Sequence, residues 1–319
     1  GAKGSTKTPA PRTPRRPPFA TGICGNWRDR CAVAQRFRCM LRPPFSCCCL
    51  ALLAMSLLPV PSRAAETAPK RPNVLFILTD DQGWGDAHFA GHPYVKTPHL
   101  DKFASQGTWL RQFYVAATVC SPSRTAFMTG HSPARHGVHG HFSTHEQNAA
   151  RSMPDWLDPQ VKTLPSLLKT AGYATAHFGK WHLTNRDTQS APKTEAYGYD
   201  EAAVFNGGAG WDSADLHATA ANTTAFIKAN KDKPFFINVW IHESHTPHVP
   251  TAESMAKWKH LDEQKQVYAA VITDGDNAVG AILEALKAEG VADNTVVMFS
   301  SDNGPEHTAT KAGPKKHDV

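Results

Sequence analysis

The sequence predicts an α/β fold, with a mainly parallel central sheet and helices on both faces. The first observation is a set of short apolar runs rich in β-branched and aromatic residues, at residues 73–79, 173–178, 234–241 and 295–300. Such runs are typical of strands that are buried on both sides. The second observation is a set of helical segments between them, at residues 98–106, 123–129, 164–170, 214–229 and 263–289. Strands that alternate with helices form parallel sheets.

The ends of these elements carry local signals. The first apolar run, Asn73-Val-Leu-Phe-Ile-Leu-Thr79, stops at Asp80-Asp81, and the glycine-containing segment 83–86 that follows predicts a loop. The last helix is long and amphipathic, and Gly290 follows it as a C-terminal cap would. The sequence contains no internal repeat.

Polar residues gather where the four predicted strands end. In strand order, these residues are Asp80 and Asp81, Lys180 and His182, His242 and His245, and finally Asp302 and Asn303. Ligands of open α/β sheets bind outside the carboxyl ends of the strands. The pattern therefore predicts one functional site at that edge of the sheet.

Four of these residues are oxygen donors, which suggests a cation site. Asp80, Asp81 and Asp302 would repel one another if they came close together, and Asn303 adds an amide oxygen. Ligation by oxygen alone suits Ca²⁺ or Mg²⁺ rather than zinc or copper. Each pair also has a structural interpretation, because Asp-Asp after a strand can cap a loop and Asp-Asn-Gly can form a type I′ turn.

A lone thiol lies just before a predicted helix, in Cys120-Ser-Pro-Ser-Arg124. A helix N-terminus favours negative charge, so the cysteine could be an activated thiolate nucleophile. It could equally be a small buried hydrophobic residue. Hard oxygen ligands beside a thiolate are an unusual pairing, because thiolates prefer soft metals.

Cys-x-Pro-Ser-Arg with Thr-Gly one short helix later resembles the signature of the formylglycine-dependent sulfatases, which belong to the alkaline phosphatase superfamily. The resemblance extends from residue 71 to about residue 306 and includes the segments TDDQGWGD, TPHLD, GKWH, SHTP and SDNG. It is about equally close to the arylsulfatase-like and the N-acetylgalactosamine-6-sulfatase-like branches. The family fold is the same α/β sheet that the apolar pattern predicts.

The resemblance implies a modified nucleophile and a bound cation. A formylglycine-generating enzyme would oxidise Cys120 to formylglycine, whose hydrate supplies an oxygen nucleophile and an oxygen ligand. The cation would be Ca²⁺, with Mg²⁺ as the alternative. Its ligands would be Asp80, Asp81, residue 120, Asp302 and Asn303.

The resemblance also implies the roles of four basic residues. Arg124 and Lys180 would neutralise the sulfuryl oxygens and the nucleophile. His245 would protonate the leaving oxygen. His182 would take the proton from the remaining hydroxyl of residue 120, so that sulfate leaves and the aldehyde is regenerated.

The expected activity is hydrolysis of sulfate monoesters of carbohydrates or aryl alcohols. A phosphatase or phosphonate monoester hydrolase of the same superfamily is one alternative. The other is a truncated, inactive remnant that binds sulfated glycans. The family has a second lysine and a small C-terminal subdomain with an antiparallel sheet. The sequence stops at Val319, so we expect that subdomain to be missing, and no role is assigned to the nearby lysines Lys311, Lys315 and Lys316.

Other residues could also contact substrate, although each has a structural interpretation. The histidine-rich stretch that follows the cysteine motif is more often a solvated loop; its members are His136, His139, His141 and His145. His242 and His248 flank His245. Trp84, Trp181 and Trp211 could stack on a sugar ring, but core packing is the more common role of tryptophan.

The composition separates a leader from the catalytic region. Six of the 7 cysteines lie in the first 49 residues, whereas all 17 histidines follow residue 71. Residues 1–71 hold 13 Lys and Arg against 2 Asp and Glu, whereas residues 72–319 hold 21 against 26. The acidic balance of this region argues against a nucleic-acid partner. Its single cysteine excludes a disulfide framework.

The domain organisation follows from this division. Residues 1–39 form a Pro/Arg-rich leader that we expect to be disordered and absent from the mature protein. Residues 40–64 resemble a signal peptide with cleavage after Ala64, residues 65–71 form a linker, and residues 72–319 form the catalytic domain. The apolar stretch is too short for stable membrane insertion. We therefore expect a secreted or periplasmic protein.

Overall fold

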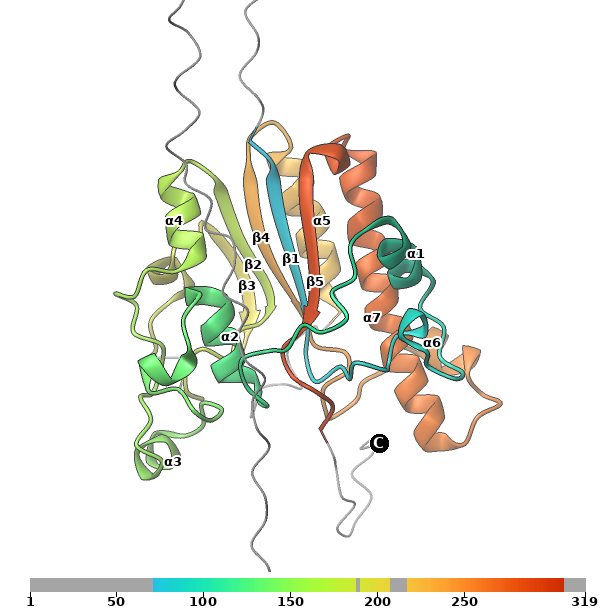
Figure 1. The fold of residues 1–319 in the computed structure, drawn as a ribbon, viewed down its shortest axis with the longest axis horizontal. Helices are drawn as coiled ribbons and strands as arrows, with labels where there is room; N and C mark the ends of the chain where they lie inside the picture. The colour runs from blue at the N-terminus through green and yellow to red at the C-terminus, as the bar shows by residue number, and fades with distance from the viewer. Residues whose placement is uncertain (1–70, 188–189, 207–216, 307–319) are drawn as a thin grey trace, which may run out of the picture. The chain divides into compact units, whose positions relative to one another are not determined.

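A computed structural model describes residues 71–187, 190–206 and 217–306 of the chain (Figure 1). All of them fall within one unit, Ala68–Val319. The leader, the signal peptide, Trp211 and the three C-terminal lysines lie outside the described residues.

The sheet has five strands, and every pairing is parallel. The strands are β1 (Asn73–Thr79), β2 (Ala174–Lys180), β3 (Glu201–Phe205), β4 (Phe235–Ile241) and β5 (Thr295–Ser301), in the spatial order β3-β2-β4-β1-β5. The predicted α/β class is confirmed. The sequence did not predict β3, because this short edge strand is mostly exposed or half-buried and lacks a continuous apolar run.

The described part contains seven α-helices. They are α1 (Pro98–Gln106), α2 (Cys120–Thr129), α3 (His145–Ala150), α4 (Leu164–Thr170), α5 (Ala218–Asn230), α6 (Ala252–Lys257) and α7 (Glu263–Ala288). The prediction that Cys120 precedes its helix is wrong, because the helix begins at Cys120 itself. Helices α3 and α6 were not predicted; each has only 6 residues, too few to show a helical period. None of these helices combines the length and apolarity that a bilayer span requires.

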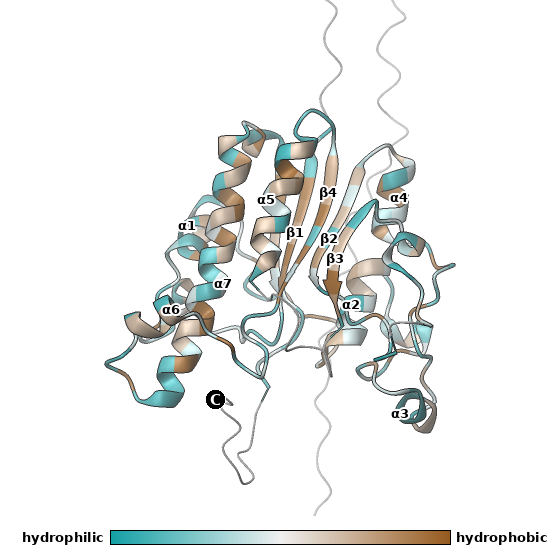
Figure 2. Ribbon diagram, turned by 180° about the vertical axis from the view of Figure 1, so that it is seen from behind, coloured by the Kyte–Doolittle hydropathy of each residue, from teal (hydrophilic) through white to brown (hydrophobic). Residues whose placement is uncertain are grey.

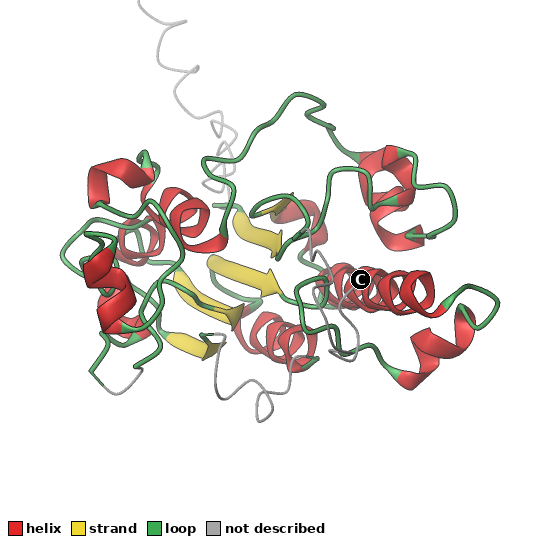
Figure 3. Ribbon diagram, turned by 90° about the horizontal axis from the view of Figure 1, so that it is seen from below, coloured by secondary structure: helices red, strands yellow, loops and turns green. Residues whose placement is uncertain are grey.

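Helices cover both faces of the sheet, as predicted. Figure 3 views the sheet from the carboxyl ends of the strands and shows helices on either side of it. Side chains of a strand alternate between the two faces, so neighbouring residues of β1 enter different cores. Leu75 and Ile77 pack with α5 and α7, whereas Phe76 and Leu78 pack on the side of α2 and α4.

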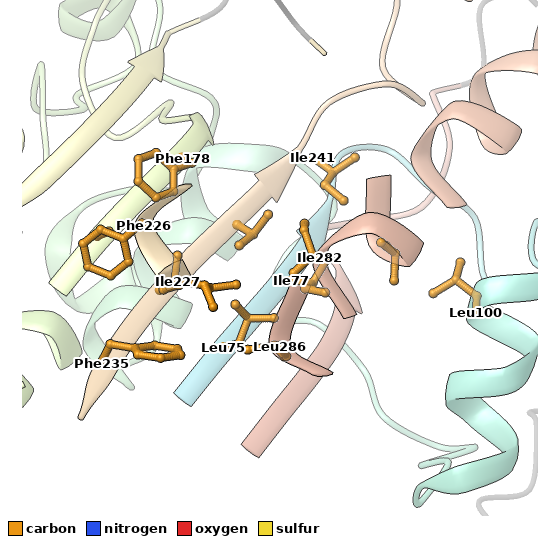
Figure 4. Close-up of a cluster of buried hydrophobic side chains, with 14 residues drawn as sticks. Leu75, Ile77, Leu100, Phe178, Phe226, Ile227, Phe235, Ile241, Ile282 and Leu286 are labelled. Carbon is orange, nitrogen blue, oxygen red and sulfur yellow. The ribbon is translucent and has the colours of Figure 1, made fainter. Parts of the chain in front are cut away.

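The core on the α5 and α7 side is made of aliphatic and phenylalanine side chains (Figure 4). Phe226 and Ile227 of α5 and Ile282 and Leu286 of α7 are all less than 5% exposed. The strands that meet them are strongly hydrophobic along most of their length (Figure 2). Burial of this apolar surface is the main stabilising contribution on that face.

The core on the α2 and α4 side is aromatic and partly polar. Trp181, Tyr197, Tyr199 and Trp240 are all at most 3% exposed. The buried His177 lies among these rings, with its centroid 4.4 Å from that of Trp240. This face therefore contains donors and acceptors that must find partners inside the protein.

Two carboxylates of α7 cap shorter helices. Asp276 accepts hydrogen bonds from the backbone N–H groups of His99 and Leu100, at the start of α1. Asp274 accepts one hydrogen bond from the backbone N–H and one from the hydroxyl of Thr251, the N-cap residue of α6. Helix α1 packs on α7, and the segment between α1 and α2 passes the carboxyl end of β5 (Figure 1).

Candidate active site

The carboxyl ends of β1, β2, β4 and β5 bring together the predicted site residues. Asp80 and Asp81 follow β1 directly, Lys180 ends β2, and Asp302 follows β5. The backbone N–H of Asp302 donates to the carbonyl of Thr79 at 3.0 Å, which holds these two strand ends together. The prediction that the strand ends converge is confirmed for this set.

Asp80 is the centre of the hydrogen-bond network and is fully buried. Its Oδ1 accepts from Arg124 Nη2 at 2.9 Å, and its Oδ2 accepts from Lys180 Nζ at 2.6 Å. The ring of His242 also contacts Oδ2 through Nδ1. Burial would raise the pKa of Asp80, but Lys180, His245 and Arg124 outweigh it and hold the pKa well below its ordinary value. Asp80 is therefore ionised.

Arg124 reaches the site from the second turn of α2 and is fully buried. Its Nε and Nη2 donate to Asp302 Oδ2 at 3.0 and 2.7 Å, and Nη1 donates to the Lys180 carbonyl at 3.1 Å. The guanidinium also lies over the ring of Trp240, 4.7 Å from its centroid. These contacts link the helix to three strand ends through charge-assisted bonds.

Asp302 and Asn303 bond back to the end of β1. Asp302 Oδ1 accepts from the backbone N–H of Asp81 at 3.1 Å, and Asn303 Nδ2 donates to Asp81 Oδ1. Neither Asn303 nor Gly304 has a positive φ. A type I′ turn needs positive φ at both central positions, so that interpretation of the motif is wrong.

Two site residues hold an unusual backbone conformation. Only three non-glycine residues of the described part have positive φ, and two of them are Asp81 at 55° and His182 at 50°. Such residues are uncommon and cluster at functional sites, where the surrounding structure holds them.

Cys120 lies among these charges at the start of α2, with 6% of its surface exposed. Lys180 Nζ lies 3.4 Å from its Sγ. Burial raises the pKa of the thiol far above its ordinary value, and the nearby carboxylates of Asp80 and Asp302 raise it further. Lys180 lowers the pKa by more than either carboxylate raises it, but burial outweighs Lys180. The unmodified thiol is therefore protonated and a poor nucleophile.

With all three carboxylates ionised, the buried site carries one more negative charge than positive charge. Asp80, Asp81 and Asp302 face two buried cations, Arg124 and Lys180. Burial and the charge of Asp80 raise the pKa of Asp81. Burial raises the pKa of Asp302 to about 7, although Arg124 opposes it. A divalent cation would let all three carboxylates ionise and would leave the site with a net charge of +1, which suits an anionic substrate.

Four side chains could hold that metal ion. Ligand atoms of Asp80, Asp81, Cys120 and His245 all lie within 4.8 Å of one another. Three of them were predicted as ligands, whereas His245 was predicted only as an acid. The buried Asn303 Oδ1 has no hydrogen-bond partner among the described residues, which is the state expected of a metal ligand. The donor set fits a cation.

The predicted histidines lie around this group. His182 Nε2 donates to the Phe142 carbonyl at 3.0 Å, and its buried Nδ1 has no hydrogen-bond partner in the described structure. Burial, with Lys180 nearby, holds the pKa of His182 well below its ordinary value, so the ring is neutral and Nδ1 can accept a proton. His245 Nε2 lies 3.5 Å from Asp81 Oδ2.

Sequence reasoning left the role of His242 undefined. It follows β4 directly, contacts Asp80 and stacks on His245 with 4.7 Å between ring centroids. Burial lowers the pKa of His242 despite the nearby Asp80 carboxylate. Its position one residue after a buried strand, like that of Asp80, was the signal that could have identified it.

The other histidines and tryptophans that could contact substrate lie in different environments. In the histidine-rich stretch, only His141 lies beside a predicted catalytic residue, with its ring 6.2 Å from that of His182. His136 pairs with His131, and His248 is buried against the Ser244 carbonyl. Core packing is confirmed for Trp181. It is wrong for Trp84, which is 64% exposed.

The fold and the site together define a class of protein. It is a parallel α/β protein with one buried polar site at the strand ends, in which fixed cations and carboxylates can hold a metal ion beside an anion. Preorganised charge of this kind stabilises the transfer of an anionic group.

The chain belongs to the sulfatase family, since residues 72–318 match the family model described as Sulfatase. It is 32% identical over 276 residues to N-acetylgalactosamine-6-sulfatase of Homo sapiens, covering 75% of this chain and 51% of the relative. It is 28% identical to the ulvan-active sulfatase of Formosa agariphila, covering 80% of this chain and 54% of the relative. The chain thus spans about half the length of these curated relatives.

Solved structures agree with this placement. The crystal structure of Ps i-CgsB is similar with a TM-score of 0.66 at 27% identity, over 74% of this chain and 59% of that one. A protein in the alkaline phosphatase superfamily from Vibrio parahaemolyticus has a TM-score of 0.52 at 19% identity, over 78% of this chain and 58% of its own length. The second similarity shows the shared fold.

Proposed function

We propose that this protein hydrolyses sulfate monoesters of carbohydrates, with residue 120 acting as formylglycine rather than as cysteine. The observation that carries the proposal is the state of Cys120. Its buried thiol has a raised pKa, yet it lies 3.4 Å from the Lys180 ammonium at a helix N-terminus. A site with this much fixed charge around a protonated thiol favours an oxygen nucleophile at the same position.

The cation is proposed to be Ca²⁺, because most of the surrounding donors are hard oxygens. Asp80, Asp81 and residue 120 would hold it, with Asn303 through its free Oδ1 and Asp302 as a further ligand. When bound, the ion supplies positive charge to a sulfate oxygen and lowers the pKa of a coordinated hydroxyl.

The basic residues have distinct proposed tasks. Arg124 and Lys180 are fixed by carboxylates and need no reorganisation to stabilise negative charge on the sulfuryl group. His182 is neutral and presents Nδ1, so it is the acceptor for a proton from residue 120. The side chain of His245 is 19% exposed, against 1% for His242, and His245 would donate a proton to the leaving oxygen.

The proposed substrate class is inferred from the names of similar proteins. Named relatives include N-acetylgalactosamine-6-sulfatase and an ulvan-active sulfatase, and a structure with 27% identity was solved with k-i-k-neocarrahexaose. These names support a sulfated glycan, and arylsulfatase J of Mus musculus, another relative at 30% identity, keeps an aryl sulfate as the alternative. The signal peptide predicted at residues 40–64 supports a secreted or periplasmic protein whose partner during maturation is a formylglycine-generating enzyme.

Mass spectrometry of the tryptic peptide 112–124 tests the proposal. Conversion of Cys120 to formylglycine makes this peptide about 18 Da lighter. The protein should be produced with and without a co-expressed formylglycine-generating enzyme, and the converted sample should then be assayed on matched nitrophenyl sulfate and phosphate esters. An unconverted thiol in the co-expressing host would contradict the proposal. A preference for phosphate would indicate a phosphatase, and binding without turnover would indicate a glycan-binding remnant.

A further inference from the structure

An exposed aromatic cluster lies beside the active site and has no part in the chemistry proposed above. Trp84 and Trp109 stack with ring centroids 6.2 Å apart and an interplanar angle of 25°. Their surfaces are 64% and 39% exposed. The guanidinium of Arg111 lies over the Trp109 ring, 5.2 Å from its centroid. Exposed indoles that stack on each other are uncommon on a protein surface without a binding role.

The cluster is held in place by the fold. Asp86 accepts hydrogen bonds from the Gly83 backbone N–H and from the Tyr268 hydroxyl of α7, which fixes the turn that carries Trp84. Phe89 meets Trp109 edge to face at 5.2 Å and packs against the main apolar core. Binding to a preformed surface costs little ordering of the protein.

The cluster is also close to the candidate metal ligands. Trp84 is three residues beyond Asp81, so their Cα atoms are separated by at most about 11 Å. Trp109 and Arg111 lie on the segment that leads to Cys120. The cluster is therefore within reach of the unit that neighbours the sulfated sugar in a glycan chain.

We propose that Trp84, Trp109 and Arg111 form a subsite for an anionic sugar unit next to the one that loses its sulfate. This inference rests on the proposed function and extends it from a sulfated monosaccharide to a sulfated oligosaccharide. A flat indole surface covers the apolar face of a pyranose ring while the ring hydroxyls stay in water. A guanidinium beside it pairs with a sulfate or carboxylate group.

A protein segment could also bind to such an exposed aromatic surface. A neighbouring leucine distinguishes binding of a protein segment from binding of a sugar unit. Leu110 follows Trp109 and is 64% exposed, the same fraction as Trp84. A protein segment that covers an apolar patch would bury Leu110 and Trp84 alike. A sugar ring needs the indole and gains little from the leucine.

The test measures binding without turnover. Isothermal titration calorimetry on the full chain carrying Cys120→Ala would use tetrasaccharides of chondroitin 6-sulfate, kappa-carrageenan and ulvan. Trp84→Ala should weaken the best ligand roughly three- to tenfold, Trp84→Phe should restore part of the loss, and Leu110→Ala should leave affinity unchanged. Arg111→Gln should weaken binding and reduce its salt dependence.

The outcomes separate this subsite from the proposed reaction. The Kd values do not depend on formylglycine or on hydrolysis, so the subsite can hold even if no sulfate is released. In active protein, Trp84→Ala should raise KM for the tetrasaccharide and leave kcat/KM for nitrophenyl sulfate unchanged. Equal losses from Trp84→Ala and Leu110→Ala would overturn the subsite. Absence of binding to all three tetrasaccharides would overturn it as well.

Discussion

The two faces of the sheet perform different tasks in this protein. The face under α5 and α7 is closed by aliphatic and phenylalanine side chains. The face under α2 and α4 holds tryptophans and tyrosines together with buried polar groups such as His177 and Asn238. The first face contributes stability through apolar burial, whereas the second also positions the residues of the site.

The connection between the second face and the site is direct. Arg124 packs over Trp240 and bonds to Asp80 and Asp302, and His177 Nε2 lies 3.1 Å from the carbonyl of Lys180. A polar core is costly unless every group is satisfied. The buried polar groups of this face hold the side chains of the candidate site in position. Substitutions on the two faces should therefore separate activity from stability.

The largest expected effect is on activity, at the start of α2. Cys120→Ser should lower multiple-turnover sulfate hydrolysis by roughly 10³-fold or more, because a serine cannot become an aldehyde hydrate with two hydroxyls. The unfolding free energy should change by less than about 1 kcal/mol, because the side chains have similar size. Steady-state kinetics and urea denaturation measure the two quantities. Turnover at the wild-type rate would disprove the role of residue 120.

Arg124→Met should cost both activity and stability. It removes the main cationic partner of Asp302 and one of the two buried cationic partners of Asp80, and breaking such a pair typically costs about 3–5 kcal/mol. Urea denaturation would show the loss, with Arg135→Met as a matched control at an exposed arginine, expected within about 0.5 kcal/mol of wild type. A loss at Arg124 no greater than at Arg135 would rule out its structural role.

Ile282→Ala tests the aliphatic face. Ile282 is fully buried between α7 and the sheet, and truncation should lower the unfolding free energy by about 2–4 kcal/mol. The kcat/KM of the folded protein should not change, because the site lies at the strand ends. The exposed Glu284 on the same helix provides a control in Glu284→Ala. A large fall in kcat/KM for Ile282→Ala would break the division between the two faces.

Acid should destabilise the polar face through His177. Burial lowers the pKa of this histidine from 6.5 to about 3, so below pH 6.5 the unfolded chain binds a proton that the folded protein does not. The unfolding free energy should therefore fall as the pH is lowered. His177 should account for about 2 kcal/mol of the fall between pH 6.5 and pH 5. His177→Gln should remove that part of the slope when denaturation is compared at the two pH values. An unchanged slope would mean that His177 is protonated in the folded state.

The smallest effect concerns one hydroxyl. Tyr199 Oη accepts a hydrogen bond of 2.6 Å from Asn238 Nδ2 in the polar core. Tyr199→Phe should lower the unfolding free energy by about 1–2 kcal/mol, because it removes the main acceptor of a buried amide. The same change at the more exposed Tyr173, which donates to the Pro72 carbonyl, should cost less than about 0.5 kcal/mol. Equal costs at the two positions would contradict the special role of the polar core.

Much of this structure could be predicted because its signals are local. Strand β1 was predicted with the observed bounds, and β2, β4 and β5 to within two residues, because each is an apolar run of β-forming residues. Strand β3 could not be predicted, because Glu201–Phe205 is an edge strand whose pairing with β2 is a tertiary contact. The start of α2 was missed because the capping residue Val119 gives no sequence signal.

The sequence by itself determined the fold class, the convergence of Asp80, Asp81, Lys180 and Asp302, and the family resemblance. These features follow from short-range pattern and from the rule that parallel strands end at one edge. Only the tertiary structure decided that His242 contacts Asp80, that the Cys120 thiol is buried and protonated, and that Trp84 is exposed. The physical reason is that burial, charge coupling and exposure depend on neighbours far apart in the chain. Arg124 and Asp302, for example, are 178 residues apart.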